Sequence, residues 1–179
     1  MSWVRVTSCI GLLCVALLGL NACTTPVSAL DTLTQAEPDG TRQRALLRLN
    51  LASAYFEQGQ TDVAQQEVRA ALQIDPQLPQ AYGLLGLIHQ RDNAPDLAQQ
   101  SFEQALQWAT QAPVQGAELA AIQHNYGWFL CQQNRFVQAQ AQFDSALSQA
   151  GYRQTEKTNR AMAFCQARAL VNTPARAQQ

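Results

Sequence analysis

The stretch Asn125-Tyr126-Gly127-Trp128-Phe129-Leu130-Cys131 returns 34 residues later as Asn159-Arg160-Ala161-Met162-Ala163-Phe164-Cys165. Leu51-Ala52-Ser53-Ala54-Tyr55 and Leu85-Gly86-Leu87-Ile88-His89 line up at the same spacing. A fixed period of this length is the signature of a repeat architecture, in which each unit packs on its neighbours. Four units can be counted, and they begin at Ala45, Pro79, Ala120 and Gln154.

Residue size also recurs within each unit, when positions are counted from its first residue. Small residues stand at positions eight, twenty and twenty-seven, and position twenty-four holds Val68, Phe102 or Phe143. Position fifteen holds Gly59, Asn93 or Asn134, which tolerate the left-handed conformation in which helices end. Each unit therefore predicts two helices joined by a tight turn, with small residues where the helices approach closely.

This pattern resembles the tetratricopeptide repeat, a helix-turn-helix unit, over about 45–171. The resemblance implies an all-α fold in which about three and a half helical hairpins stack into a right-handed superhelix with a concave inner face. A helical bundle without repeats is the alternative. The fourth unit is incomplete, because a helix from about Gln154 to Val171 is followed by Pro174, which prevents a second helix. We predict a repeat domain over 41–171 and a disordered tail over 172–179.

Composition and motifs argue against several classes of protein. The 179 residues, 47% of them hydrophobic, suffice for one domain with a core. The 12 basic and 13 acidic residues nearly balance, which gives no argument for binding nucleic acid. The sequence has no zinc-protease, nucleotide-loop or serine-hydrolase motif, and its two histidines, His89 and His124, have no ligand set near them. We predict no enzyme activity, no cofactor, no metal and no small-molecule substrate.

The first 22 residues have the features of a bacterial signal peptide. Arg5 is the only charge before Asp31, and the apolar run from Ile10 to Leu20 is shorter than the roughly 20 residues that span a bilayer. The run ends in Leu20-Asn21-Ala22-Cys23, which resembles the lipobox of bacterial lipoproteins, although Asn21 departs from the usual small residue. The resemblance implies cleavage before Cys23 and lipidation of its thiol. A secretory signal cut near Ala22 or Ala29 is the alternative.

Residues 23–40 contain Pro26, Pro38 and Gly40, and we predict that they form a flexible tether between lipid and repeats. In lipoprotein sorting, an aspartate after the lipidated cysteine retains the protein in the inner membrane. Thr24 stands at that place here. The resemblance to lipoproteins therefore implies a lipid anchor on the periplasmic face of the outer membrane.

The third unit narrows the family. Its stretch Asn125–Cys131, followed by Phe143 and Ala146-Leu147, resembles the PilF/PilW family of type IV pilus biogenesis lipoproteins. Members called pilotins help secretin subunits reach the outer membrane and form their pore, and the family usually has more repeat after its fourth unit begins. The resemblance implies a protein that assists localisation and assembly of the pilus secretin. A repeat lipoprotein that scaffolds another cell-envelope assembly is the alternative.

In tetratricopeptide repeats the first helix of each unit lines the concave face, through positions two, five, six, nine, twelve and thirteen. Position six is asparagine in three units, and asparagine can pair with the backbone of an extended peptide. Trp128 is the strongest single candidate for a partner contact, since buried aromatic side chains often anchor interfaces. For the asparagines and for Trp128 alike, contacts inside the protein are the alternative role. No run of lysine and arginine occupies these positions, which argues against a clamp for a terminal carboxylate. The predicted partner-binding residues are Leu46, Leu49, Asn50, Phe56, Leu84, Leu87, His124, Asn125, Trp128, Asn159 and Met162.

The five cysteines have different expected fates. Cys9 and Cys14 leave with the signal peptide, Cys23 carries lipid, and Cys131 and Cys165 share position twelve of adjacent units. An oxidising periplasm favours a disulfide between the last two. Equivalent helices lie about 8–10 Å apart by axis, whereas a disulfide needs Cα atoms within about 7 Å, so these helices must lean together. Two buried free thiols are the alternative.

Overall fold

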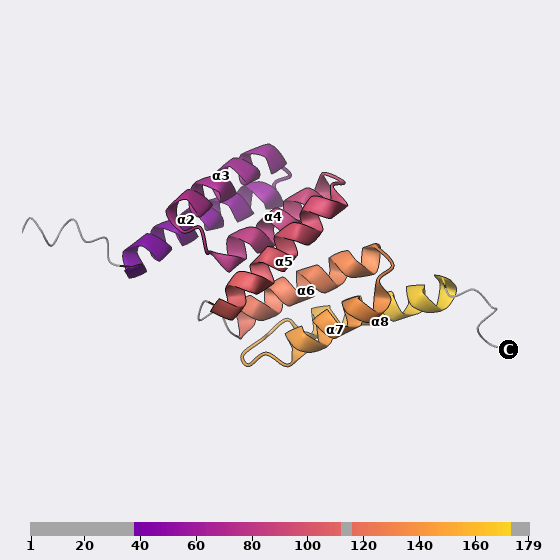
Figure 1. The fold of residues 1–179 in the computed structure, drawn as a ribbon. Helices are drawn as coiled ribbons and strands as arrows, with labels where there is room; N and C mark the ends of the chain where they lie inside the picture. Colours follow the sequence, from indigo (N-terminus) through magenta and orange to yellow (C-terminus); the bar gives the residue numbers. More distant parts are fainter. Residues whose placement is uncertain (1–37, 112–115, 173–179) are drawn as a thin grey trace, which may run out of the picture. The chain divides into compact units, whose positions relative to one another are not determined.

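A computed structural model of the protein describes residues 38–111 and 116–172. Within these two ranges the chain forms seven helices and no strand, which confirms the all-α prediction (Figure 1). The signal peptide 1–22, Cys23 with its predicted lipid, the tether up to residue 37 and the tail from residue 173 lie outside the described residues. The helices are α2 (Pro38–Glu57), α3 (Thr61–Ile74), α4 (Pro79–Arg91), α5 (Pro95–Gln111), α6 (Ala117–Gln132), α7 (Phe136–Leu147) and α8 (Thr155–Asn172).

The first helix begins earlier than the sequence suggested. Residues 38–40, predicted as the end of the tether, form the first turn of α2. Proline is well tolerated at the first helical position, because the N–H that it lacks has no partner there and its fixed φ suits the helix. Pro38 is therefore compatible with α2, and Pro38–Gly40 belong to this helix and not to a flexible linker.

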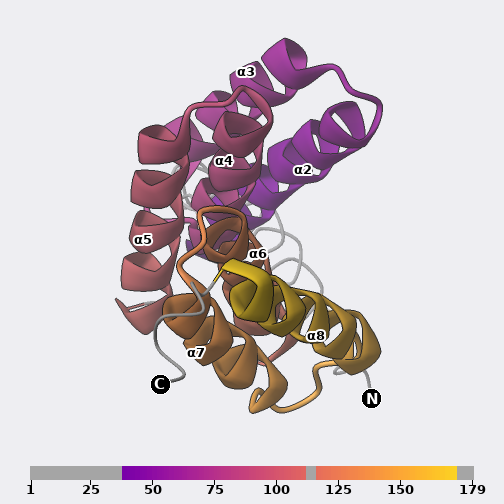
Figure 2. The same ribbon diagram turned by 90° about the vertical axis from the view of Figure 1, so that its right-hand side faces the viewer.

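The helices pair into three hairpins, α2 with α3, α4 with α5 and α6 with α7, as the repeat predicted. Figure 2 shows the first helices α2, α4 and α6 on one side of the stack and the second helices α3, α5 and α7 on the other. Each hairpin turns at position fifteen, where Gly59, Asn93 and Asn134 have φ values of 79°, 55° and 59°. The prediction of a left-handed residue at this position is confirmed.

The same hydrogen bond closes every one of these turns. The N–H of the residue after the left-handed one donates to a carbonyl five residues earlier, at 2.9 Å in each hairpin. This bond satisfies a carbonyl that the ending helix leaves free, and it brings the chain directly into the next helix. The three bonds run from Gln60 to Tyr55, from Ala94 to His89 and from Arg135 to Leu130.

Close packing inside the hairpins explains the small residues at position eight. A Cβ atom added to Gly86 would lie 2.7 Å from the ring of Phe102, and one added to Gly127 would lie 2.9 Å from the ring of Phe143. Both rings are fully buried. The glycines thus let α4 and α6 approach their partner helices closely enough to cover a phenylalanine.

Helix α8 packs in a different orientation from the other first helices. In α6, Tyr126 and Phe129 pack against Phe102 of α5, with ring centroids 5.4 and 5.6 Å from the Phe102 ring. Their counterparts in α8, Arg160 and Ala163, are exposed. The buried residues of α8 are Thr158 and Cys165, which contact α6.

This orientation follows from the residues that α8 carries. Stacking like α6 would bury Arg160 with no partner, at a large desolvation cost. In the structure α8 leaves Arg160 and Lys157 in solvent, and it buries Thr158 and Cys165, whose counterparts His124 and Cys131 are also buried in α6. The predicted lone helix at the end of the stack is therefore present, but its faces are not those of a regular repeat.

Candidate protein-binding groove

The first helices of three units enclose a hollow on their common side. Its volume is about 390 Å³, and its lining comes from α2, α4 and α6. We call it the α2–α6 groove. Its lining residues are Leu49, Ser53, Gln80, Gly83, Leu84, Leu87, Ala117, Glu118, Ala121, Ile122 and Asn125.

Four of the predicted partner-binding residues meet in this groove. Leu49 and Leu84 are only 6% and 7% exposed, so they form its floor more than its accessible surface. Leu87 and Asn125 are half-buried and lie open to an occupant. Gly83 leaves space in the lining, where a Cβ atom would lie only 3.3 Å from the side chain of Ile122. The groove is therefore apolar at its base and shallow enough for a polypeptide.

Three polar residues of the groove, Ser53, Gln80 and Glu118, were not among the predicted ones. Gln80 donates through Nε2 to Oε2 of Glu118 at 2.7 Å, and this pair joins α4 to α6. The Oε1 atom of Gln80 is buried, and within the described residues it has no hydrogen-bond partner. An acceptor without a partner can accept a hydrogen bond from the backbone N–H of a bound peptide. Gln80 stands at the inward position two of its unit, whereas Glu118 precedes the third unit and no repeat signal marks it.

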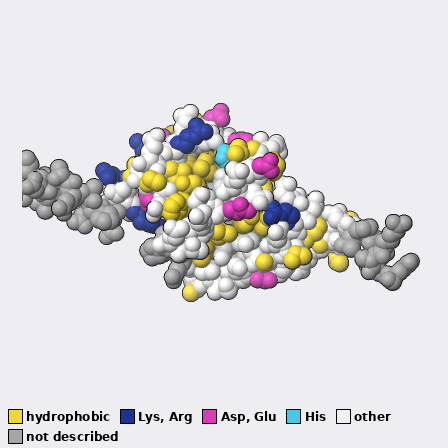
Figure 3. All heavy atoms as spheres, viewed as in Figure 1, with side chains coloured by type: hydrophobic (Ala, Val, Ile, Leu, Met, Phe, Trp, Pro, Cys, Tyr) yellow, Lys and Arg dark blue, Asp and Glu magenta, His cyan; other side chains and the backbone are white. Residues whose placement is uncertain are grey.

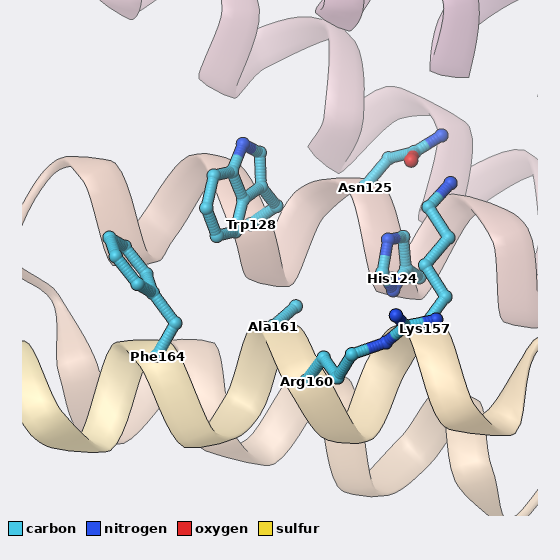
Figure 4. A pocket seen from close by; sticks show the side chains of 7 residues that line it. All are labelled: His124, Asn125, Trp128, Lys157, Arg160, Ala161 and Phe164. Carbon is cyan, nitrogen blue, oxygen red and sulfur yellow. The ribbon is translucent and has the colours of Figure 1, made fainter.

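A second cavity of about 460 Å³ lies between α6 and α8, and we call it the α6–α8 pocket. Trp128 and Phe164 lie together at one end of it, with ring centroids 5.5 Å apart, and Lys157 and Arg160 lie toward the other (Figure 4). No run of lysine and arginine was predicted at the inward positions. Lys157 and Arg160 stand at positions four and seven of the fourth unit, outside those inward positions, and they line this pocket from α8. His124, Asn125 and Ala161 complete the lining.

His124 was predicted to face the groove, but its ring is engaged inside the protein. It is 6% exposed, and its Nδ1 lies 2.8 Å from Oγ1 of Thr158. The hydroxyl of Tyr152 lies 2.7 Å from the same oxygen. Burial, together with the nearby charge of Lys157, lowers the pKa of His124 to about 4. The ring is therefore neutral at pH 7 and belongs to the contact between α6 and α8.

Cys131 and Cys165 form a disulfide that joins α6 to α8, with their Cα atoms 5.7 Å apart. The bond lies in the same cluster as Met162, which was predicted to face the groove. Met162 packs toward α7 instead, where its sulfur accepts a hydrogen bond from Nε2 of Gln140 at 2.9 Å. These two contacts hold α8 against α6 and against α7, respectively.

The remaining predicted residues do not gather in either cavity. Leu46 packs against the first core cluster. Phe56 is covered by Arg91, whose guanidinium carbon lies 3.6 Å from the centre of its ring. Asn50 and Asn159 are exposed and line neither cavity. Of the three asparagines at position six, only Asn125 lines the two cavities. These asparagines therefore do not form a continuous row of hydrogen-bonding groups along one groove.

No helix among the described residues is long and apolar enough to cross a bilayer. The described ranges also hold no group of three or more acidic, histidine or cysteine side chains suited to a metal ion. Side chains of both charge signs are scattered over the face drawn in Figure 3, between larger apolar and uncharged areas. A smaller cavity of about 230 Å³ lies beside the turns of the second and third hairpins, lined by Gln90, Asn93, Pro95, Phe129, Gln132 and Gln133.

Comparison with known proteins supports the repeat and the family. The tetratricopeptide-repeat family matches residues 25–88 and 79–111. The type IV pilus assembly protein PilF of Pseudomonas aeruginosa is 31% identical over 121 residues, which are 68% of this chain and 44% of that protein. An uncharacterized protein of Haemophilus influenzae is 29% identical over 68% of this chain and 64% of its own length.

Two solved structures have the same fold. A structure of PilW, described as a widely conserved type IV pilus biogenesis factor, superposes with a TM-score of 0.62 at 31% identity, over 70% of this chain and 55% of that one. The structure of Pseudomonas aeruginosa PilF gives a TM-score of 0.64 at 24% identity, over 73% and 56%. The chain spans about half the length of these pilus proteins. It is a tetratricopeptide-repeat protein, homologous to the PilF and PilW type IV pilus biogenesis proteins.

Proposed function

We propose that this protein is a pilotin: a lipoprotein, anchored through Cys23 on the periplasmic face of the outer membrane, that binds the type IV pilus secretin and assists its assembly. The homology to PilF and PilW supports a role in pilus biogenesis. The lipobox-like stretch ending in Cys23 supports the anchor. The partner is a protein, because this repeat fold presents an extended hollow rather than a catalytic constellation.

The observation that carries the proposal is the composition of the α2–α6 groove. Its floor is apolar, and Leu87 offers half-buried surface to an incoming side chain. Gln80 and Asn125 supply amide groups along the same hollow. An apolar base with a few polar groups suits a polypeptide segment that buries hydrophobic side chains while its backbone finds hydrogen-bond partners.

The groove can be tested by blocking it. Ala121 is half-buried in the lining, so Ala121→Arg places a long charged side chain in the hollow. Val137 on α7 is 85% exposed and outside the groove, which makes Val137→Arg the matched control. We expect secretin multimers, measured on gels of cell envelopes, to be lost with Ala121→Arg and kept with Val137→Arg. Normal multimers with both variants would refute binding through this groove.

The anchor needs a separate test, since a free protein could still bind. With Cys23→Ala, we expect the protein in the soluble periplasmic fraction and the secretin unassembled at the outer membrane. Co-purification from solubilised envelopes then identifies the partner. Recovery of peptidoglycan synthases or outer-membrane assembly factors in place of secretin would support the alternative of a scaffold for another envelope assembly.

A further inference from the structure

The α6–α8 pocket joins an aromatic wall to two basic side chains. Trp128 is half-buried, and Phe164 is 50% exposed although it is a large apolar side chain. Lys157 and Arg160 are both exposed and line the same cavity (Figure 4). An apolar wall beside two cationic side chains suits a ligand that carries both an apolar group and a negative charge.

The two cations are available to a ligand. Lys157 forms no ion pair within the described ranges. Arg160 pairs with Glu156 at 3.5 Å, and the two side chains are 75% and 84% exposed, so this contact contributes little and can be exchanged. Lys157 also stands in the first turn of α8, where the helix dipole disfavours a positive charge. Helix stability therefore does not explain this lysine.

Apart from the exposed Glu156, the groups around the pocket do not neutralise this charge. The ring of His124 is neutral at pH 7, and the acceptor groups at Thr158 are occupied by His124 and Tyr152. Asn125 is the other polar lining residue, and it carries no charge. The positive charge of the pocket thus comes from Lys157 and Arg160, and both lie on one helix face three residues apart.

We propose that the α6–α8 pocket binds an internal acidic segment of a protein partner, with side-chain carboxylates on Lys157 and Arg160 and a large apolar side chain against the wall that Trp128 and Phe164 form together. Arginine pairs with carboxylate through two parallel hydrogen bonds, and aromatic walls bury an apolar side chain with defined geometry. The inference is independent of which protein occupies the α2–α6 groove. The nearly balanced charge of the whole chain, with a formal net charge of -1, favours a peptide over a nucleic acid.

The test uses short fluorescent peptides and the full chain. One peptide, blocked at both ends, carries two aspartates followed by a phenylalanine; a second replaces the aspartates with lysines; a third presents the phenylalanine with a free terminal carboxylate and no aspartate. We expect binding, measured by fluorescence anisotropy, for the first peptide alone. Equal binding of the lysine peptide would overturn the proposal, and binding of only the third would replace the internal segment with a chain terminus.

Substitutions locate the binding. Lys157→Gln with Arg160→Gln should weaken the aspartate peptide about tenfold, because both charge-assisted contacts are lost. Arg69 is an exposed arginine on α3, outside the pocket, and Arg69→Gln should leave the affinity unchanged. Reversal of both charges to glutamate should transfer binding to the lysine peptide. An unchanged affinity in the neutralised variant, or preferential binding of single-stranded DNA by the wild type, would refute the assignment.

Discussion

Replacing Gly127 by alanine tests how closely the third hairpin is packed. In an open helix the change from glycine to alanine stabilises by about 1 kcal/mol. Here the new methyl carbon would lie 2.9 Å from two ring carbons of Phe143 and 3.2 Å from the carbonyl oxygen of Ala139. The ring is fully buried and the carbonyl belongs to the backbone of α7, so neither moves freely.

The steric cost exceeds the gain in helix propensity. Overpacking a buried site costs about 1–3 kcal/mol, and subtracting the propensity gain of about 1 kcal/mol leaves a net loss of up to about 2 kcal/mol in the free energy of unfolding of Gly127→Ala. Urea unfolding followed by circular dichroism measures this as a lower midpoint at an unchanged slope. Gly40 in the first turn of α2 has no atom within 4 Å of an added Cβ, and Gly40→Ala should leave stability equal or slightly higher.

The first unit suggests how the cost can be relieved. There the same two positions hold Ala52 and Val68, both fully buried in one cluster. A methyl at position eight is thus accepted where position twenty-four holds a smaller side chain. In a Phe143→Val background, Gly127→Ala should cost less than in the wild type by about 1 kcal/mol. If Gly127→Ala stabilises the wild type as much as Gly40→Ala does, the packing argument is wrong.

Three further outcomes follow from the contacts of α6 and α8. Removing the disulfide with Cys131→Ser and Cys165→Ser should lower the free energy of unfolding by about 3–4 kcal/mol, the loop entropy expected for a separation of 34 residues; equal urea midpoints for the double variant and the oxidised wild type would contradict this. The pKa of His124 is lowered to about 4 on folding, so the unfolded chain binds its proton first, and stability should fall by about 2 kcal/mol as the pH drops from 7.5 to 5. A His124→Gln variant should lose that part of the acid sensitivity, and an unchanged pH dependence would show that the ring titrates normally. Asn134 has a φ of 59°, so Asn134→Ala should cost about 1 kcal/mol while Asn134→Gly costs less, a ranking that thermal unfolding can reverse or uphold.

The hairpins could be predicted from sequence because each signal is local. A glycine or asparagine at position fifteen ends a helix through its own backbone preference, as Gly59, Asn93 and Asn134 do. Small residues at position eight and large ones at position twenty-four meet inside a single unit, as Gly127 and Phe143 do. The period of 34 then repeats the same contact along the chain, so one correct unit implies the next.

The orientation of α8 could not be predicted in the same way. Its sequence aligns with α6, and the matched cysteines and asparagines gave no reason to expect a different face. The orientation depends instead on which residues the neighbouring helices can bury, and that balance disfavours Arg160. Met162, Asn159 and the basic pair of the α6–α8 pocket were misplaced or missed for this one reason.

The disulfide determines at which end the stack of helices begins to unfold. A linear array of repeats opens from its ends, because an outer element has neighbours on one side only. At one end, α8 is tied to α6 by a covalent bond, whereas α2 is held to α3 and α4 by packing, hydrogen bonds and exposed ion pairs. Fraying should therefore start at α2, and amide hydrogens there should exchange with solvent before those around Cys165.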